Sequence, residues 1–202
     1  MRRVLIAVLL AVGLLTGACG SGGGGAAPKF YGITHDAYHV LPDPLTDTAG
    51  QPFSLVDDTR KPLTLVFFGY THCPDICPMV MSSLASGLTR LSASERSKVQ
   101  VIFVTTDPSR DTPAVLRTYL DHYNKAFLGL TGPIEEIAKI ALPLAVYVAQ
   151  GQKLPSGGYD LNTHSTQVTA IGADNKARVL WDMDTSSAQF ASDIHTLLQK
   201  AS

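Results

Sequence analysis

The sequence is short of cysteine and of excess charge, and both shortages exclude classes of protein. Its 202 residues contain only three cysteines, too few for a small disulfide-stabilised domain or for a zinc site with four cysteine ligands. The 16 lysines and arginines are balanced by 17 acidic residues, so the chain lacks the cationic surplus of a nucleic-acid-binding protein. We therefore expect no nucleic-acid partner. The odd number of cysteines also requires a separate explanation for one sulfur.

Long hydrophobic runs are equally scarce, and the one that occurs lies near the N-terminus. Arg2 and Arg3 precede an uncharged apolar run at residues 4–15. This layout is typical of a secretory signal peptide, since a transmembrane helix needs about 20 apolar residues. Residues 15–19 read LTGAC and resemble the bacterial lipobox, although Thr16 stands where that motif more often has leucine. We predict a signal peptide at residues 1–18 and lipid attachment at Cys19.

The segment that follows Cys19 predicts a tether. Residues 20–28 read GSGGGGAAP, a flexible composition, so we expect residues 19–29 to be a lipidated tether to the extracytoplasmic face of the bacterial cell membrane. Loss of residues 1–18 removes two arginines and changes the formal net charge from -1 to -3. With Cys19 assigned to lipid, the two cysteines left are Cys73 and Cys77.

Residues 30–202 show no repeat and no second shift of composition, which indicates one domain. Continuous apolar runs predict buried strands, and proline-led segments with helical spacing predict helices. The expected strands are 63–68, 99–104, 144–148, 167–172 and 177–181. Three helices are expected to begin at Pro78, at Pro113 (with Thr112 as its N-cap) and at Pro133, and a fourth is expected at 187–199. A small hairpin is expected at 46–55. This order predicts an α/β, thioredoxin-like fold, with a central mixed sheet flanked by helices and an N-terminal β-hairpin.

The two remaining cysteines lie in the sequence GYTHCPDICP at residues 69–78, between a predicted strand and a predicted helix. Ligand sites of open α/β sheets gather at such positions. A helix N-terminus lowers thiol pKa values and favours the thiolate, which binds soft metals and attacks disulfides. Three residues separate Cys73 from Cys77, one more than in the thioredoxin motif, which favours a metal between the sulfurs. A plain stabilising disulfide is the alternative that the two cysteines alone leave open.

Two motifs carry a family resemblance. FGYTHCPDICP at residues 68–78 and VTTDPSRDTP at residues 104–113 closely resemble the Sco/SenC family of copper chaperones for cytochrome c oxidase assembly. The resemblance extends over about residues 45–198. It implies a thioredoxin-like fold in which Cys73, Cys77 and the distant His164 bind copper. Two thiolates suit Cu(I), and an added imidazole also accommodates Cu(II).

The chain departs from the family pattern beside this histidine. Thr163 stands where the family usually has an acidic residue, so the imidazole would need support from elsewhere. We name Asp107 as a candidate supporting residue, because it matches the Asp-Pro element of the family and ends the neighbouring strand. A turn-forming role of Asp107 is the alternative. His72 is expected to line the loop and Met81 to join the core. His35 and His39 are expected to be solvated, and His122 and His195 to lie on the surface or to be partly packed.

Together with the predicted lipid anchor, the resemblance implies a membrane-anchored metallochaperone that delivers copper to, or prepares, the binuclear copper site of the copper-bearing subunit of cytochrome c oxidase. An upstream copper donor would supply the ion. Three alternatives stay open, and the first is a thiol-disulfide oxidoreductase that reduces the oxidase cysteines with Cys73 or Cys77. The others are a peroxiredoxin-like peroxidase and a binding domain with a structural disulfide. Whether the protein is an enzyme therefore stays open.

Overall fold

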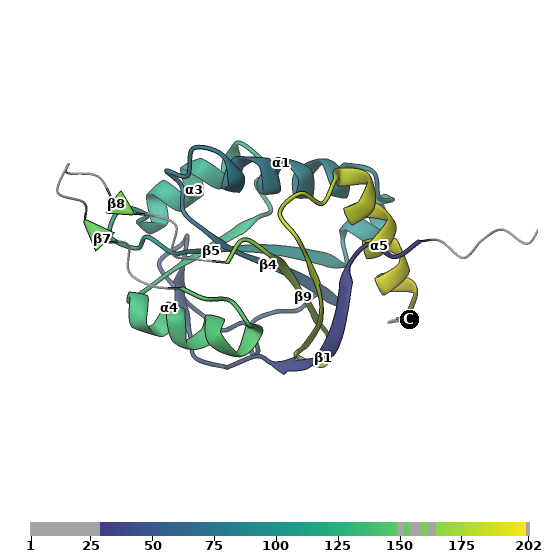
Figure 1. The fold of residues 1–202 in the computed structure, drawn as a ribbon, viewed down its shortest axis with the longest axis horizontal. Helices are drawn as coiled ribbons and strands as arrows, with labels where there is room; N and C mark the ends of the chain where they lie inside the picture. Colours follow the sequence, from purple (N-terminus) through teal and green to yellow (C-terminus); the bar gives the residue numbers. More distant parts are fainter. Residues whose placement is uncertain (1–28, 149–151, 154–158, 161–164, 201–202) are drawn as a thin grey trace, which may run out of the picture.

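The computed structural model describes residues 29–148, 152–153, 159–160 and 165–200. Within these residues, helices pack on both faces of a central mixed sheet (Figure 1). The order of the strands in the sheet is β1 (Ile33–His39), β10 (Lys176–Trp181), β9 (Val168–Gly172), β4 (Leu63–Gly69), β5 (Val99–Thr105), β6 (Leu128–Thr131), β2 (Leu45–Asp47) and β3 (Pro52–Phe53). A separate small sheet pairs β7 (Gln152–Lys153) with β8 (Tyr159–Asp160). The predicted thioredoxin-like α/β fold is confirmed.

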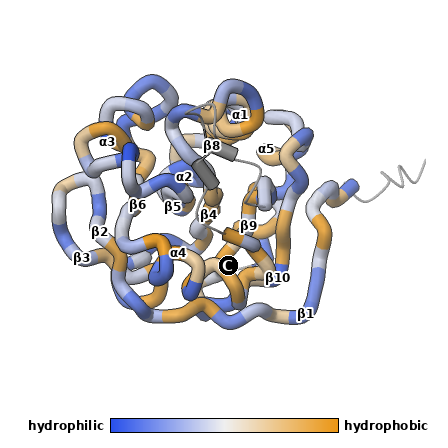
Figure 2. The backbone as a smooth tube through the Cα atoms, turned by 60° about the vertical axis from the view of Figure 1, so that its left-hand side comes forward, coloured by the Kyte–Doolittle hydropathy of each residue, from blue (hydrophilic) through white to orange (hydrophobic). Residues whose placement is uncertain are grey.

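The centre of the sheet is formed by β4 and β5. The two strands run parallel, β4 pairs antiparallel with β9 on its other side, and every residue of β4 is buried. A strand covered on both faces reads as an unbroken apolar run, which explains why residues 63–68 and 99–104 were predictable. Figure 2 shows hydrophobic residues concentrated along the inner strands.

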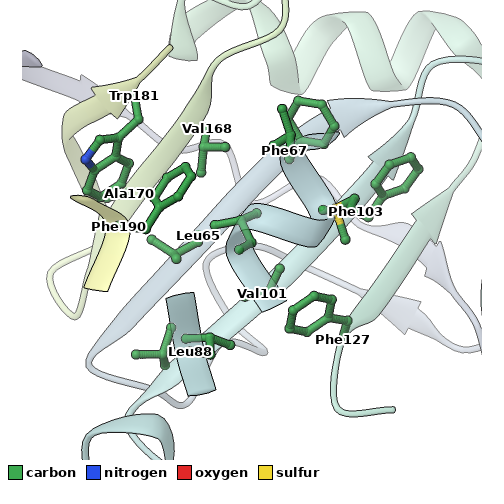
Figure 3. Close-up of a cluster of buried hydrophobic side chains, with 14 of the residues drawn as sticks. Leu65, Phe67, Leu88, Val101, Phe103, Phe127, Val168, Ala170, Trp181 and Phe190 are labelled. Atoms are coloured by element: carbon green, nitrogen blue, oxygen red, sulfur yellow. The ribbon is translucent and has the colours of Figure 1, made fainter. Parts of the chain in front are cut away.

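Helices cover the two faces unequally. The helices α1 (Ile76–Thr89), α3 (Pro113–Asp121) and α5 (Ser187–Lys200) cover one face, and α4 (Ile134–Ala141) covers the other (Figure 1). A short helix, α2 (Ala93–Arg96), leads into β5. Figure 3 shows the larger core, in which Phe67 and Phe103 of the sheet lie in one cluster with Trp181 and Phe190. No helix in the described part of the chain is long and apolar enough to cross a membrane.

Most predicted boundaries are confirmed. Thr112 caps α3 by accepting a hydrogen bond from the Val115 amide, and Pro113 is its first residue. Pro133 directly precedes α4, α5 begins at Ser187 as predicted, and β2 pairs with β3 as the expected hairpin. The start of α1 was predicted wrongly, because the helix begins at Ile76, two residues before Pro78. Proline is tolerated there because the amides of the first turn have no partner within the helix.

The strand predicted at residues 144–148 is wrong. The chain forms a short 3₁₀ helix, η1 (Leu142–Leu144), and then turns at Ala145, whose φ is 56°. Leu144, Val146 and Val148 are nevertheless buried, and Tyr147 between them is exposed. The apolar run therefore marks a segment with several buried side chains, but the 3₁₀ helix with Pro143 and the left-handed Ala145 keep it from forming a strand.

Five elements of the described chain were not predicted: β1, β6, α2 and the short strands β7 and β8. The start of β1 is fixed by a buried carboxylate on α5. Asp193 accepts hydrogen bonds from the indole N–H of Trp181 at 2.8 Å and from the amides of Tyr31 and Gly32 at 2.9 and 2.7 Å. Hydrogen bonds from three donors compensate the cost of removing this carboxylate from water. Asp193 thereby holds the entry of the chain into the domain against α5.

Candidate metal centre

The cysteine loop, residues 70–75, begins where β4 ends. The amide of Thr106, just after β5, donates to the carbonyl of Gly69 at 2.6 Å, which holds the two strand ends together. A Cβ atom on Gly69 would lie 2.8 Å from the sulfur of Cys77, closer than such atoms approach. Glycine at this position therefore makes the space in which the Cys77 thiol lies.

The two cysteines of this region are both unlinked thiols. Cys77 is the second residue of α1 and is fully buried, whereas Cys73 in the loop keeps 9% of its surface exposed. The amide of Cys77 donates a hydrogen bond to the sulfur of Cys73 at 3.4 Å. An amide of the first helical turn that has no partner within the helix thus points at this sulfur. Cys73 is therefore the less deeply buried of the two cysteines.

The surroundings shift the pKa values of the two thiols in opposite directions. Burial raises the pKa of Cys73, but hydrogen bonds from the backbone of Cys77 and Asp75 and from the Tyr70 side chain outweigh burial and lower that pKa overall. Burial raises the pKa of Cys77, and the nearby charges of Cys73 and Asp111 raise it further. Cys73 is therefore the thiol that ionises first.

Tyr70 is the first residue of the cysteine loop. Its side chain is buried, and burial together with the charge of Cys73 raises the pKa of its hydroxyl. The hydroxyl therefore stays protonated at neutral pH and can donate to the Cys73 thiolate. This contact supports the anionic form of Cys73 without adding a charge.

A carboxylate that sequence reasoning missed holds the loop in place. Asp111 is fully buried and accepts hydrogen bonds from the Thr71 amide at 2.9 Å, the Thr71 hydroxyl at 2.6 Å and the Thr105 hydroxyl at 2.7 Å. Its oxygen also lies 3.7 Å from Nδ1 of the exposed His72. Asp111 thus joins the end of β5 to the residues just before Cys73. Its place in the DTP turn sequence gave no signal of burial.

Asp107, the residue predicted to support the site, has other partners. Its carboxylate accepts from the Ser109 hydroxyl at 2.6 Å and forms an ion pair with Arg110. Its amide donates to the Thr105 hydroxyl at 2.9 Å, so Asp107 organises the turn that carries Asp111. Its role toward a metal stays a prediction.

His164 lies outside the described residues, as do Thr163 and Cys19. The described chain resumes at Ser165, whose amide donates to the Tyr147 carbonyl at 3.0 Å. Three residues later, Val168 pairs with Phe67 of β4. Ser165 therefore lies three residues before the β9 residue that pairs near the end of β4, from which the cysteine loop departs.

The other candidates behave as expected. Met81 is buried in the core, Met79 is exposed, and His72 is exposed beside Thr71. His195 on α5 contacts Glu95. Among the described residues, no group of three or more His, Cys, Asp or Glu side chains is arranged to hold a metal, so the described part of the centre supplies two sulfur donors.

These two donors fit a soft metal ion. Two thiolates favour Cu(I), zinc or iron-sulfur chemistry over hard cations, and a third nitrogen donor would extend the site to Cu(II). The same sulfurs can instead form a disulfide, and a disulfide leaves no thiolate for a metal. The centre therefore supports metal binding or thiol exchange, one at a time.

Comparison with known proteins identifies the family. The SCO1/SenC family model matches residues 35–199. Mitochondrial SCO2 of Saccharomyces cerevisiae is 36% identical over 107 residues, which cover 48% of this chain and 36% of the yeast protein. The chain covers less than two thirds of the length of the curated relatives that it matches first.

Two solved structures resemble the whole domain. Copper-bound ScoI of Bradyrhizobium japonicum aligns with a TM-score of 0.68 and 31% identity, covering 79% of this chain and 99% of ScoI. Apo Sco1 of Thermus thermophilus aligns with a TM-score of 0.75 and 30% identity, covering 86% of this chain and 99% of Sco1. With a family model that matches most of its length, this chain belongs to the SCO1/SenC family.

Proposed function

We propose that this protein is a copper metallochaperone, held at the extracytoplasmic face of the bacterial membrane by a lipid on Cys19. Cys73, Cys77 and His164 bind one copper ion and pass it to, or prepare, the binuclear copper site of cytochrome c oxidase. The observation that carries the proposal is the pair of unlinked thiols, one in the loop before α1 and one in its first turn, of which Cys73 is the less deeply buried. The copper-bound state of the similar ScoI supports copper as the cargo.

The two thiols have separate tasks in this proposal. Cys73 is the less deeply buried and more acidic thiol, so it meets the incoming ion first. Cys77 loses its proton only when the ion arrives, because burial raises its pKa. Copper binding therefore releases protons, and its affinity rises with pH. Release to a partner follows by ligand exchange at Cys73, the sulfur that a partner thiolate can reach.

The support for a metal comes from the loop and its neighbours. Asp111 fixes Thr71, and the backbone around Cys77 fixes the Cys73 sulfur. Thr163 in place of the usual acidic residue predicts that the His164 imidazole is oriented by another group, for which Asp107 is our candidate. An upstream copper donor would load the site, and the copper-bearing oxidase subunit would unload it.

A thiol-disulfide oxidoreductase is the second candidate, and the opposite pKa shifts of the two thiols favour it. The Cys73 thiolate would attack a disulfide of the oxidase subunit and form a mixed disulfide. Cys77 would then attack the Cys73 sulfur and release the second partner thiol. Two electrons pass to the partner, and Cys73 and Cys77 end as a disulfide. His164 has no part in these steps.

The test is a copper titration of the reduced protein, run beside a thiol-exchange assay. The chaperone proposal predicts one copper ion per chain, lost in Cys73→Ala and weakened in His164→Ala. Loss of exchange in Cys73→Ala with unchanged copper affinity in both variants would instead select the oxidoreductase. Anchoring is tested separately by the mass of the N-terminal peptide, which carries lipid on Cys19 if the proposal holds.

A further inference from the structure

Cationic side chains cluster at the end of β4 opposite to the cysteine loop. A hollow of about 390 Å³ lies at the start of β4 and has Leu63, Val179 and Leu197 among its lining residues. A second hollow of about 240 Å³ adjoins it, since Pro62 and Ala173 line both. We call the lining of the two hollows the cationic face. Its positively charged residues are Arg60, Lys61, Lys176, Arg178 and Lys200.

The face carries a local excess of charge that the composition hides. One carboxylate, Asp174, lies within it and pairs with Arg178 at 2.8 Å, so five positive charges and one negative charge give a net charge of +4. The chain from residue 19 onward has a net charge of -3, and its remainder therefore carries -7. The nearly balanced charge of the whole sequence therefore conceals an uneven distribution, with positive charge on this face and negative charge elsewhere.

The chain enters the domain beside this face. The amides of Tyr31 and Gly32 are fixed to Asp193 of α5, and Nζ of Lys200 lies 5.9 Å from the centre of the Phe30 ring. Figure 1 shows the start of β1 beside α5, far from β7 and β8. The ten residues 19–28 that precede Lys29 reach at most about 35 Å when fully extended. A lipid on Cys19 would therefore keep the face within that reach of a bilayer.

We propose that the cationic face docks on an anionic phospholipid surface and directs the cysteine loop away from the membrane. The proposal rests on the proposed anchor at Cys19 only for the short reach of the tether. The charge of the face complements lipid phosphates, and the apolar lining accommodates the aliphatic stems of the lysines and arginines. β4 is seven residues long, so docking places the cysteine loop about 20 Å farther from the lipid. There it is open to a partner.

The cationic face should bind by the sum of several weak contributions. Each lysine or arginine near an anionic surface strengthens binding about fivefold, so removal of two charges weakens docking about 30-fold. Surface charges act over about 10 Å at moderate ionic strength, so high salt should release the face. The paired Arg178 contributes less than the others, because Asp174 already neutralises it.

The test measures energy transfer from the single tryptophan, Trp181, to a dansyl-labelled lipid. Purified apo-protein is mixed with vesicles of phosphatidylcholine alone or with equal phosphatidylglycerol. We expect greater transfer from the anionic vesicles, whether or not Cys19 carries lipid, and loss of the excess in about 0.5 M salt. The double variant Lys61→Gln/Lys176→Gln should lose the excess. Lys139→Gln/Lys153→Gln, which removes the same charge from α4 and β7, should keep it.

Equal transfer from neutral and anionic vesicles by the unaltered protein would overturn the proposal, and so would an excess that survives in Lys61→Gln/Lys176→Gln. If this double variant instead impairs copper delivery to the oxidase subunit and leaves lipid transfer unchanged, the face binds protein and the proposal is wrong. A copper titration of the same samples separates these results from a failure of the metal centre, because neither lysine lies near the thiols.

Discussion

At the carboxyl end of β4 the chain buries two thiols and a carboxylate, whereas at the amino end it gathers five cations around open hollows. The cysteine end depends on hydrogen bonds among buried groups. The cationic face depends on exposed charges that solvent screens. Single substitutions should therefore have large effects at the first end and small, additive effects at the second.

The largest effect is expected at the enclosed sulfur. Cys77→Ser should lower copper affinity by more than about 100-fold, since loss of a residue that only supports a ligand already costs 10–100-fold. The measurement is a competition titration with a Cu(I) chelator. Cys19→Ser removes a sulfur outside the centre and should leave the affinity unchanged. Equal affinity of Cys77→Ser and the unaltered protein would remove Cys77 from the centre.

The buried carboxylate should come next. Asp111→Asn keeps the size of the side chain but loses acceptor capacity toward Thr71 and Thr105, so copper affinity should fall about 10-fold or more. The free energy of unfolding should fall by about 1–3 kcal/mol. Asp107→Asn should cost less stability than Asp111→Asn, because the Asp107 carboxylate is partly exposed and has Arg110 and Ser109 as its side-chain partners. A larger loss of copper affinity in Asp107→Asn than in Asp111→Asn would instead assign the supporting role to Asp107.

The two ends can be compared with one kind of substitution. In Gly69→Ala the added Cβ would lie 2.8 Å from the Cys77 sulfur, so we expect a loss of about 1–3 kcal/mol of stability. In Gly172→Ala, at the other end of the sheet, the nearest atom is 3.0 Å away on the flexible Asp174 side chain, so the loss should be smaller. Chemical denaturation measures both. Equal losses would contradict the tight packing assigned to the cysteine end.

The last comparison lies within the cysteine end and separates the two thiols themselves. The pKa of Cys73 lies below the ordinary value of 9.0, and that of Cys77 lies above it. As the pH rises, Cys73 therefore becomes thiolate first and should react with iodoacetamide first in the reduced apo-protein. Peptide mass mapping across a pH series gives the order. Labelling of Cys77 at the lower pH would contradict the assigned shifts.

The sequence predicted the elements whose signal is local. Unbroken apolar runs marked β4 and β5, and Thr112 with Pro113 marked the start of α3. Helical spacing marked α5. The position of the cysteine pair at the end of β4 followed from these elements. The identity of the metal as copper and the choice of His164 as a ligand came from the family motifs. Composition and periodicity alone did not indicate them.

The sequence could not predict features that depend on pairing between distant segments. β1 is an edge strand whose residues are partly exposed, so it shows neither alternation nor an apolar run. Asp111 and Asp193 look like ordinary polar residues, and they are buried because β5 and α5 place donors around them. The cationic face joins residues from β10, from α5 and from the segment before β4.

The central claim is that one copper ion is held by two sulfurs and one imidazole. X-ray absorption spectroscopy of the copper-loaded, reduced protein tests it most directly. The account predicts two sulfur neighbours and one histidine nitrogen for the unaltered protein, and loss of the nitrogen alone in His164→Ala. A spectrum without sulfur neighbours, or one that is unchanged by His164→Ala, would contradict it.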